Sequence, residues 1–245
     1  MAGYFVQRLL GTIPVLLLIS LLVFLLIHAA PGDPTLMLLG EETNAAEVAK
    51  AKAQWGLDRP LYVQYLKFAA STLTGEFGKS FKYAEPVSRV IKARLPATIE
   101  LAIFSIIIAV VLAIPLGVWA GSKPNSWLDN LGTTFGLFGI SMPSFWLGIM
   151  LILLLAGVLN ILPTSGRSTY GIAGPENTGF YLLDSLLQGN GTAVWDALTH
   201  ICMPALALGV NMLGILMRVT RPSVLEVMNE EYVVTARAKG LPEKK

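Results

Sequence analysis

The sequence predicts an all-α protein with several membrane-spanning helices. Of its 245 residues, 54% are hydrophobic and only 14% are charged, whereas charged residues make up about 25% of soluble domains. The mean hydropathy is +0.62. Four stretches are apolar and long enough, or nearly so, to cross the ~30 Å hydrocarbon core, which takes about 20 helical residues. A polytopic membrane protein is therefore expected.

The first two expected spans are residues 9–30 and 97–121. The first carries no charged residue and is followed by Pro31-Gly32-Asp33-Pro34, where the prolines cannot continue a helix. It is longer than the apolar part of a secretory signal and lacks a small-residue cleavage site, so it is predicted to remain uncleaved. The second span has only Glu100, near its start.

The third and fourth expected spans are residues 131–161 and 201–217. The third is free of charge but too long for one straight crossing, and Ser141-Met142-Pro143-Ser144 interrupts it. The fourth has Pro204 in its first turn. Ser141, Pro143 and Ser144, with Asn211 in the fourth span, are the candidates for a translocation path, because backbone breaks at membrane depth are tolerated where they line a cavity or protein. The alternative is a kink and an interhelical hydrogen bond that serve packing alone.

Positive charge predicts the orientation. The segment after the fourth span carries Arg218, Arg221, Arg237, Lys239, Lys244 and Lys245, and short cation-rich segments mark the cytoplasm. With four spans the N-terminus is then cytoplasmic too. The expected organisation is a first transmembrane helix at 1–30, an extracytoplasmic helical segment at 31–93 and a transmembrane domain at 94–245. This domain is expected to contain an extracytoplasmic loop at 162–200 and a cytoplasmic coupling region at 222–245.

The extracytoplasmic segment is predicted to be partly helical. Residues 44–55 have helical periodicity, and Pro60 is placed to begin a second helix. Gly78-Lys79-Ser80 resembles a phosphate-binding loop only superficially, because Leu73 stands where that pattern requires glycine. A turn is expected there instead.

A short polar segment near the end of the chain is predicted to be a docking helix. It runs from Glu230 to Leu241 and mixes small residues with Arg and Lys. Ala236 would allow a partner's backbone to approach closely, and Gly240 would end the helix. The alternative is a basic amphipathic segment that holds the membrane surface.

Several functions find no support in the residues. The formal net charge is only +2 and no basic run alternates with aromatic residues, so no nucleic-acid partner is expected. No catalytic constellation, cofactor site or carboxylate pair within the spans is apparent. The soft metal ligands are His28, His200 and Cys202. Residues 200 and 202 would lie about 200° apart around a helix, so no metal site is expected.

Seven motifs, in order along the chain, resemble the dipeptide, oligopeptide and nickel permease family of ABC importers. They are Tyr4-Phe5-Val6-Gln7-Arg8-Leu9-Leu10 with Ile13-Pro14, Pro31-Gly32-Asp33-Pro34, Gly56-Leu57-Asp58-Arg59-Pro60, Gly75-Glu76-Phe77-Gly78-Lys79-Ser80, Arg94-Leu95-Pro96-Ala97-Thr98, Ser141-Met142-Pro143-Ser144-Phe145-Trp146 and the 230–241 segment. Each motif is weak alone, but their shared order is specific. Members of this family continue into two further membrane helices, so this sequence, which ends at Lys245, is expected to be incomplete.

The resemblance implies the type I permease fold of ABC importers, in the inner membrane. It implies a second homologous permease subunit, two cytoplasmic ABC ATPases, an extracytoplasmic substrate-binding protein and the lipid bilayer as partners. This chain would be non-catalytic and would import peptides or similar solutes by ATP-driven alternating access. The residues implied in coupling to the ATPases are Glu231, Tyr232, Thr235, Ala236, Arg237, Ala238, Lys239, Gly240 and Leu241. A scaffold or assembly subunit that docks a partner without conducting, and a permease for nickel or another solute, remain as alternatives.

Overall fold

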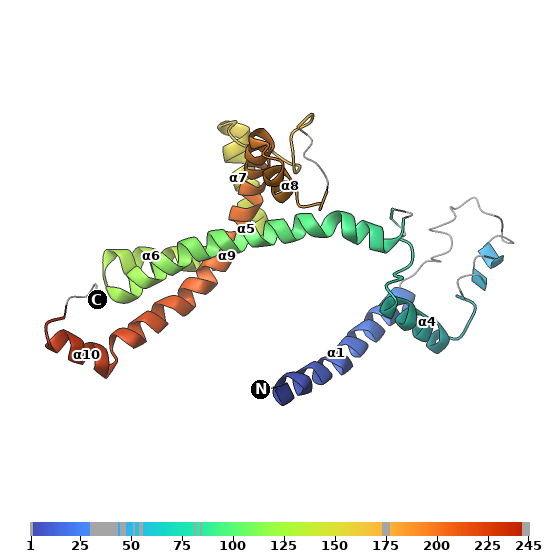
Figure 1. The fold of residues 1–245 in the computed structure, drawn as a ribbon, viewed down its shortest axis with the longest axis horizontal. Helices are drawn as coiled ribbons and strands as arrows, with labels where there is room; N and C mark the ends of the chain where they lie inside the picture. Colours follow the sequence, from blue (N-terminus) through green and yellow to red (C-terminus); the bar gives the residue numbers. More distant parts are fainter. Residues whose placement is uncertain are drawn as a thin grey trace. The chain divides into compact units, whose positions relative to one another are not determined.

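The computed structural model describes residues 2–29, 44, 48–50, 52–53, 56–80, 82–83, 85–172 and 177–241. These residues form helices and connecting turns (Figure 1). The helices are α1 (Ala2–Ala29), α4 (Leu61–Leu73), α5 (Val87–Ser122), α6 (Trp127–Ser141), α7 (Ser144–Leu151), the π-helix η1 (Ile152–Val158), α8 (Tyr181–Leu187), α9 (Gly191–Met228) and α10 (Glu231–Ala238). The chain divides into two compact units, Met1–Ala93 and Arg94–Lys245, and each is described by itself.

The first unit is built from α1 and α4. Phe24 of α1 is buried, and its ring lies 5.5 Å from that of Tyr65 and 5.9 Å from that of Phe68 on α4. A hydrogen bond of 2.9 Å joins the Ser20 and Tyr65 hydroxyls. At the end of α1, the Nε2 atom of His28 lies 3.1 Å from Oε1 of Gln64. One stripe of α1 therefore holds α4, while its other faces stay exposed and apolar.

Parts of the segment between α1 and α5 are helical, as the sequence predicts. Residues 48–50 and 52–53 are helical, and α4 begins directly after Pro60. Gly78 has a φ of +74°, and the chain reverses direction after it: the Ser80 N–H donates to the Glu85 carbonyl over 2.8 Å, and the Val87 N–H donates to the Gly78 carbonyl over 2.9 Å. The expected turn at Pro31-Gly32-Asp33-Pro34 lies outside the described residues.

Two expected spans are longer in the structure than their apolar windows. Helix α5 starts at Val87, ten residues before the predicted 97, because Arg89, Lys92 and Arg94 lower the hydropathy without interrupting the helix. Helix α9 likewise starts at Gly191, where the Asn190 side chain accepts a hydrogen bond from the Ala193 N–H. Helix α8 was not predicted by the sequence. The polar residues of 181–200 lower the mean hydropathy, but this region still forms α8 and, after a break at residues 188–190, the first turns of α9.

The third expected span is divided between two helices that do not share an axis. Helix α6 and the α7/η1 helix are bent by 102° at a short break. Met142 is extended, with φ −87° and ψ 128°, as expected for a residue before proline. Pro143 supplies no N–H to continue the helix. Among the residues that the structure describes, three helices are long and apolar enough to cross a membrane, or four if the bent pair forms one span.

Helix α9 is the centre of the second unit. It packs against α6 along its later half and against α7 and α8 along its earlier half (Figure 1). Small residues allow α5 and α6 to approach it closely. A Cβ atom placed on Gly117 would lie 2.8 Å from Cβ of Thr220, and one on Gly132 would lie 3.0 Å from Cε of Met217. Gly117 and Gly121 on α5, and Gly132 and Gly136 on α6, are each four residues apart, and both pairs allow close packing against α9.

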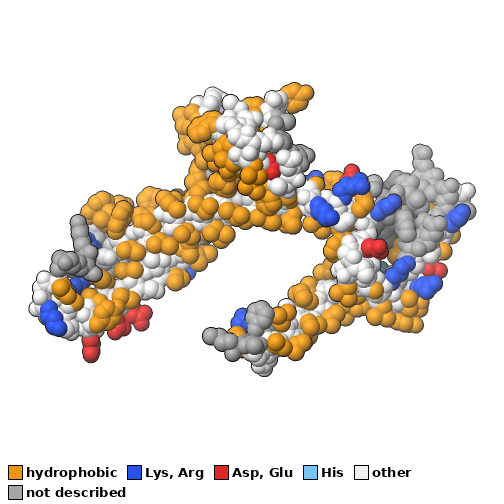
Figure 2. Space-filling model, viewed as in Figure 1, with side chains coloured by type: hydrophobic (Ala, Val, Ile, Leu, Met, Phe, Trp, Pro, Cys, Tyr) orange, Lys and Arg blue, Asp and Glu red, His pale blue; other side chains and the backbone are white. Residues whose placement is uncertain are grey.

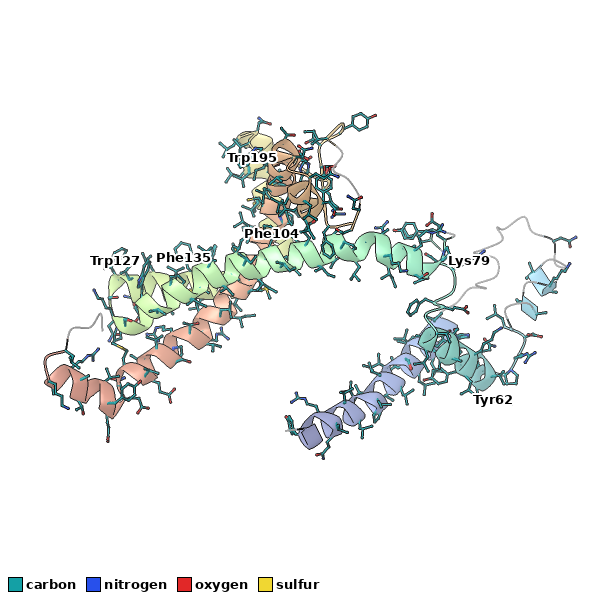
Figure 3. All side chains as sticks on the ribbon, in the orientation of Figure 1. Tyr62, Lys79, Phe104, Trp127, Phe135 and Trp195 are labelled. Atoms are coloured by element: carbon teal, nitrogen blue, oxygen red, sulfur yellow. The ribbon has the colours of Figure 1, made fainter. Side chains whose placement is uncertain are left out.

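The outward faces of these helices are apolar. Figure 2 shows hydrophobic side chains over most of the visible surface of α5, α6 and α9, and charged side chains gathered around α10. Trp127 and Phe135 project from α6 away from α9 (Figure 3), and both are more than half exposed. A surface of this kind suits contact with lipid or with other membrane helices.

Candidate functional site

The predicted docking segment forms its own helix, α10, after a turn at Asn229. Its C-terminus is closed by Gly240, whose φ is +75°. The Gly240 N–H donates to the Arg237 carbonyl over 2.9 Å, and the Leu241 N–H donates to the Ala236 carbonyl over 3.2 Å. This pair of bonds is the Schellman motif, in which glycine takes the left-handed position at least cost. Gly240 therefore ends the helix, as its position in the sequence predicts.

Helix α10 presents one face to solvent and the other to the protein. Val233 and Ala236 are half-buried, and α10 contacts α9. The remaining predicted coupling residues are exposed, namely Glu231, Tyr232, Thr235, Arg237, Ala238, Lys239, Gly240 and Leu241. Ala236, which is predicted to admit a partner's backbone, is half-buried. Of the two alanines at positions 236 and 238, Ala238 is the exposed one, and it lies three residues after Thr235, on the same side of the helix.

An ion pair joins the start of α6 to the last part of α9. The Nε and Nη2 atoms of Arg221 donate to the two carboxylate oxygens of Asp129 over 2.5 and 2.8 Å. Asp129 also accepts from the Asn125 N–H at 2.9 Å, and its side chain is 3% exposed. We call this pair the Asp129–Arg221 clamp. Because bidentate Arg–carboxylate geometry fixes both groups, the clamp ties the α5–α6 turn to the helix that leads into α10.

The break between α6 and α7 is joined to Asn211. The Nδ2 atom of Asn211 donates to the Met142 carbonyl over 3.2 Å. This carbonyl lies outside both helices and has no helical partner, so the side chain of α9 satisfies it. Ser141 and Pro143 are exposed, whereas Ser144 is half-buried. The structure thus brings the four predicted path residues together around one backbone break.

A second charged cluster lies at the α8 end of the second unit. The Arg167 Nη2 atom is 3.1 Å from Oε2 of Glu100 and 3.0 Å from the Gly179 carbonyl. Oε1 of Glu100 accepts from the Leu182 N–H over 2.7 Å. Glu100 is 8% exposed. One carboxylate of α5 therefore holds both the 159–180 connection and the first turn of α8.

Two aspartates organise the same end of the unit. Asp184 accepts from the Thr178 hydroxyl at 2.7 Å and from the Asn177 N–H at 2.9 Å. Burial by itself raises the pKa of the Asp184 carboxyl, but these hydrogen bonds outweigh it and lower that pKa below its ordinary value. Asp196 accepts from the Thr169 N–H at 2.9 Å. These bonds give the polar connection a defined conformation.

The sequence analysis predicted α10 and the break between α6 and α7. It did not predict the Asp129–Arg221 clamp or the Glu100–Arg167 cluster. In the sequence, Glu100 was noted only as the charged residue near the start of the second span, and Arg221 only as one of the cations that predict the orientation. Their positions at the edges of apolar stretches could have marked them, because charges there are usually paired or functional. Within the part of the chain that the structure describes, no group of three His, Cys, Asp or Glu side chains could hold a metal ion.

Known proteins resemble this chain over nearly its whole length. Residues 113–245 match the family described as binding-protein-dependent transport system inner membrane component, and residues 1–102 match the N-terminal family of the same membrane components. The probable D,D-dipeptide transport system permease protein DdpB of Escherichia coli (strain K12) is 41% identical over 237 residues, which cover 96% of this chain and 70% of that protein.

Two further relatives are of the same kind. The dipeptide transport system permease protein DppB of Alkalihalophilus pseudofirmus is 36% identical, over 98% of this chain and 72% of its own length. The glutathione transport system permease protein GsiC of Salmonella typhimurium is 37% identical, over 99% of this chain and 70% of its own length. With its apolar helices and these matches, the chain belongs to the family of inner-membrane permease components of binding-protein-dependent transport systems.

Proposed function

We propose that this chain is a permease subunit of an ABC importer that moves short peptides into the cell by ATP-driven alternating access. The observation that carries the proposal is α10, a short exposed helix with a closed C-terminus at the end of α9. A helix of this kind suits docking into a groove of a cytoplasmic partner. The chain would itself be non-catalytic, and ATP would be hydrolysed by the partner.

The proposed assembly contains a second permease subunit, two cytoplasmic ATPases and an extracytoplasmic binding protein. The α10 end, with the N-terminus, would face the cytoplasm, and the α8 end would face outward. The concentration of Lys and Arg after the last span supports this orientation. The exposed apolar faces of the long helices offer area for lipid and for a second permease.

The clamp suggests how movement of α10 reaches the membrane. A displacement of α10 acts on the end of α9, and the Asp129–Arg221 clamp makes α6 move with it. Helix α6 leads into the break, which Asn211 of α9 also holds. A discontinuous helix can change its bend more easily than a continuous one, so we place the gate of the translocation path at Ser141, Pro143 and Ser144.

Short peptides are the proposed cargo. The relatives with 36–41% identity carry names that specify dipeptides, D,D-dipeptides and glutathione. All three are small molecules with peptide bonds and charged ends. The polar groups at the break between α6 and α7 could contact the peptide bonds of such solutes.

A bulky substitution on the exposed face of α10 tests the proposal. We expect Ala238→Trp, in the complete transporter, to abolish uptake of a labelled dipeptide and peptide-stimulated ATP hydrolysis, because overpacking a docked contact costs about 1–3 kcal/mol or more. Ser223→Trp is the matched control, since Ser223 is exposed on α9 before the turn and should tolerate the change.

The outcomes separate the possible roles of α10. Normal uptake by Ala238→Trp would sink the docking proposal and favour a role for α10 as a surface anchor, which a tryptophan would not disturb. A wild-type complex that stimulates ATP hydrolysis but takes up no peptide would indicate a scaffold or another cargo. Protein levels in the membrane, measured by immunoblot, exclude a loss of insertion.

A further inference from the structure

Helix α4 of the first unit carries an exposed apolar stripe that the proposed mechanism does not use. Tyr62, Leu66 and Leu73 follow one another at spacings of four and seven residues, so they lie on one side of the helix. They are 69, 65 and 89% exposed, and Tyr62 projects outward from α4 (Figure 3). We call these three residues the α4 stripe. Large apolar side chains gathered in this way mark a surface that contacts a partner or a membrane.

The other sides of α4 are occupied. One side packs its aromatic rings on Phe24 of α1. Gln64 lies about 200° around the helix from Tyr62. Its Nε2 atom donates to the Leu57 and Arg59 carbonyls over 3.2 and 2.7 Å. The polar connection before α4 therefore lies on the side of the helix opposite the stripe.

The contacts with α1 fix the depth of α4 in a membrane. The Tyr65 hydroxyl lies 2.9 Å from the Ser20 hydroxyl, and the Tyr65 ring lies 5.5 Å from that of Phe24. The apolar stretch of α1, Val6–Ala29, has 24 residues, and the hydrocarbon core takes about 20 helical residues. Wherever a window of about 20 residues is placed in this stretch, it contains both Ser20 and Phe24. Helix α4 is therefore held against a part of α1 that lies within the hydrocarbon layer.

This depth indicates what covers the stripe. Water is excluded from the hydrocarbon core, so apolar side chains held at that level face lipid or protein. On α1, Leu21 and Leu25 are next in sequence to the contact residues Ser20 and Phe24, and both are exposed. The α4 stripe thus continues the exposed apolar surface of a membrane-spanning helix. Acyl chains that cover this surface of α1 extend to α4.

The shape and polarity of α4 suit a helix that lies along the membrane interface. It has 13 residues, too few to cross the core, which takes about 20. The connection on its polar side carries Asp58 and Arg59, both exposed, and these charges stay in water at little cost. An apolar side that enters the lipid, a polar side that faces water and tyrosine side chains at the boundary are typical of interfacial helices.

We propose that α4 is an interfacial helix whose stripe is embedded among the acyl chains of the leaflet at the Ala29 end of α1. In the proposed orientation this is the outer leaflet. Part of the 31–93 segment then lies in the membrane and not in water, and α4 anchors the segment beside α1. The inference requires that α1 spans the bilayer, but it does not depend on the cargo or on an ATPase.

Spin labels test the surroundings of the stripe directly. In a Cys202→Ser background, which removes the single cysteine, a nitroxide is attached to Leu66→Cys in the full-length protein, reconstituted in phosphatidylcholine nanodiscs. Oxygen concentrates among acyl chains, whereas a water-soluble nickel chelate is excluded from them. We expect the label at 66 to collide with oxygen several-fold more often than with the chelate. Leu18→Cys, on an exposed face of α1, calibrates lipid, and Asp58→Cys calibrates water.

The neighbouring position is the matched control. Lys67 is exposed, and a Cβ atom placed on Gly56 would lie 3.5 Å from its Nζ atom, so Lys67 faces the polar connection. A label at Lys67→Cys should therefore collide with the nickel chelate more often than the label at Leu66→Cys does. Equal ratios at the two positions would overturn the proposal, because an interfacial helix has one side in lipid and another in water.

Two further outcomes would also overturn it. A label at 66 that the chelate reaches as readily as the label at Asp58→Cys would place the stripe in water. A label at 66 that neither reagent reaches would show that protein covers the stripe, from another subunit or a second copy of this chain. If Leu66→Cys folds poorly, Leu73→Cys, at the most exposed position of the stripe, gives the same comparison.

Discussion

At the scale of single residues, Asp184 shows how one carboxylate orders a polar connection. It is 1% exposed and accepts hydrogen bonds from Asn177 and Thr178, just before α8. Burial opposes its ionisation, but the hydrogen bonds to the ionised form prevail, and its pKa is lowered from 3.8. The folded connection therefore binds a proton less readily than the unfolded one.

The sign of this shift predicts an acid sensitivity. A lowered pKa contributes stability that is complete above the unfolded pKa of about 4 and is lost as the pH falls through the lower folded value. We expect the Thr178 amide to be strongly protected from solvent exchange at neutral pH and to lose protection in acid, when its exchange rate is compared with the intrinsic amide rate at the same pH. Hydrogen exchange measured against pH checks this.

A variant assigns the acid effect to this residue. Asp184→Asn should remove most of the pH dependence and expose the Thr178 amide at every pH, because an amide has one acceptor oxygen where the carboxylate has two. Asp58→Asn, at an exposed position of the first unit, is the control. Unchanged exchange in Asp184→Asn would contradict this role of the carboxylate.

At the scale of elements, the break and the clamp determine how α6 and α9 are joined. The sequence predicted an interruption at Ser141–Ser144 correctly, because proline has a local effect on its own helix. It could not predict the 102° bend. The direction in which a chain leaves a proline depends on what it packs against, here α9, and on which side chain takes the Met142 carbonyl.

The clamp predicts that substitutions of Arg221 and of the nearby Arg218 have different effects on stability and on transport. Removing one partner of a largely buried pair leaves the other charge uncompensated, so we expect Arg221→Gln to destabilise the protein by about 2 kcal/mol, allowing for its partial exposure. It should also uncouple ATP hydrolysis from peptide uptake. Exposed Arg218→Gln should do neither. Thermal unfolding in detergent and the ratio of uptake to ATP hydrolysis are the measurements.

Exchanging the two charges distinguishes the electrostatic attraction of the clamp from a contribution of side-chain packing. In the double variant Asp129→Arg with Arg221→Asp, the attraction is restored although both side chains differ in shape. Partial recovery of the uptake ratio relative to Arg221→Gln would support an electrostatic link. A double variant no better than its two single variants would show that shape, and not the ion pair, joins α6 to α9.

At the scale of the whole molecule, the proposed orientation makes opposite predictions for the two ends of the second unit. In a Cys202→Ser background, a cysteine at Tyr170, whose side chain is fully exposed, should react with a membrane-impermeant thiol reagent in intact cells. A cysteine at Lys239 should react only after the membrane is opened. Labelling of position 239 from outside would reverse the orientation and place α10 beyond the reach of cytoplasmic ATPases.

The sequence by itself determined the class of the protein, the approximate spans, the turn at Gly78 and the end of α10 at Gly240. These features depend on local properties: apolar length, the missing N–H of proline and the left-handed backbone of glycine. Only the tertiary structure decided that Ala236 is half-buried while Ala238 is exposed, and that Asn211 bonds the Met142 carbonyl. It alone paired Asp129 with Arg221, and Glu100 with Arg167. Those partners are 92 and 67 residues apart in the chain, and local preferences carry no information about which distant side chains packing brings together.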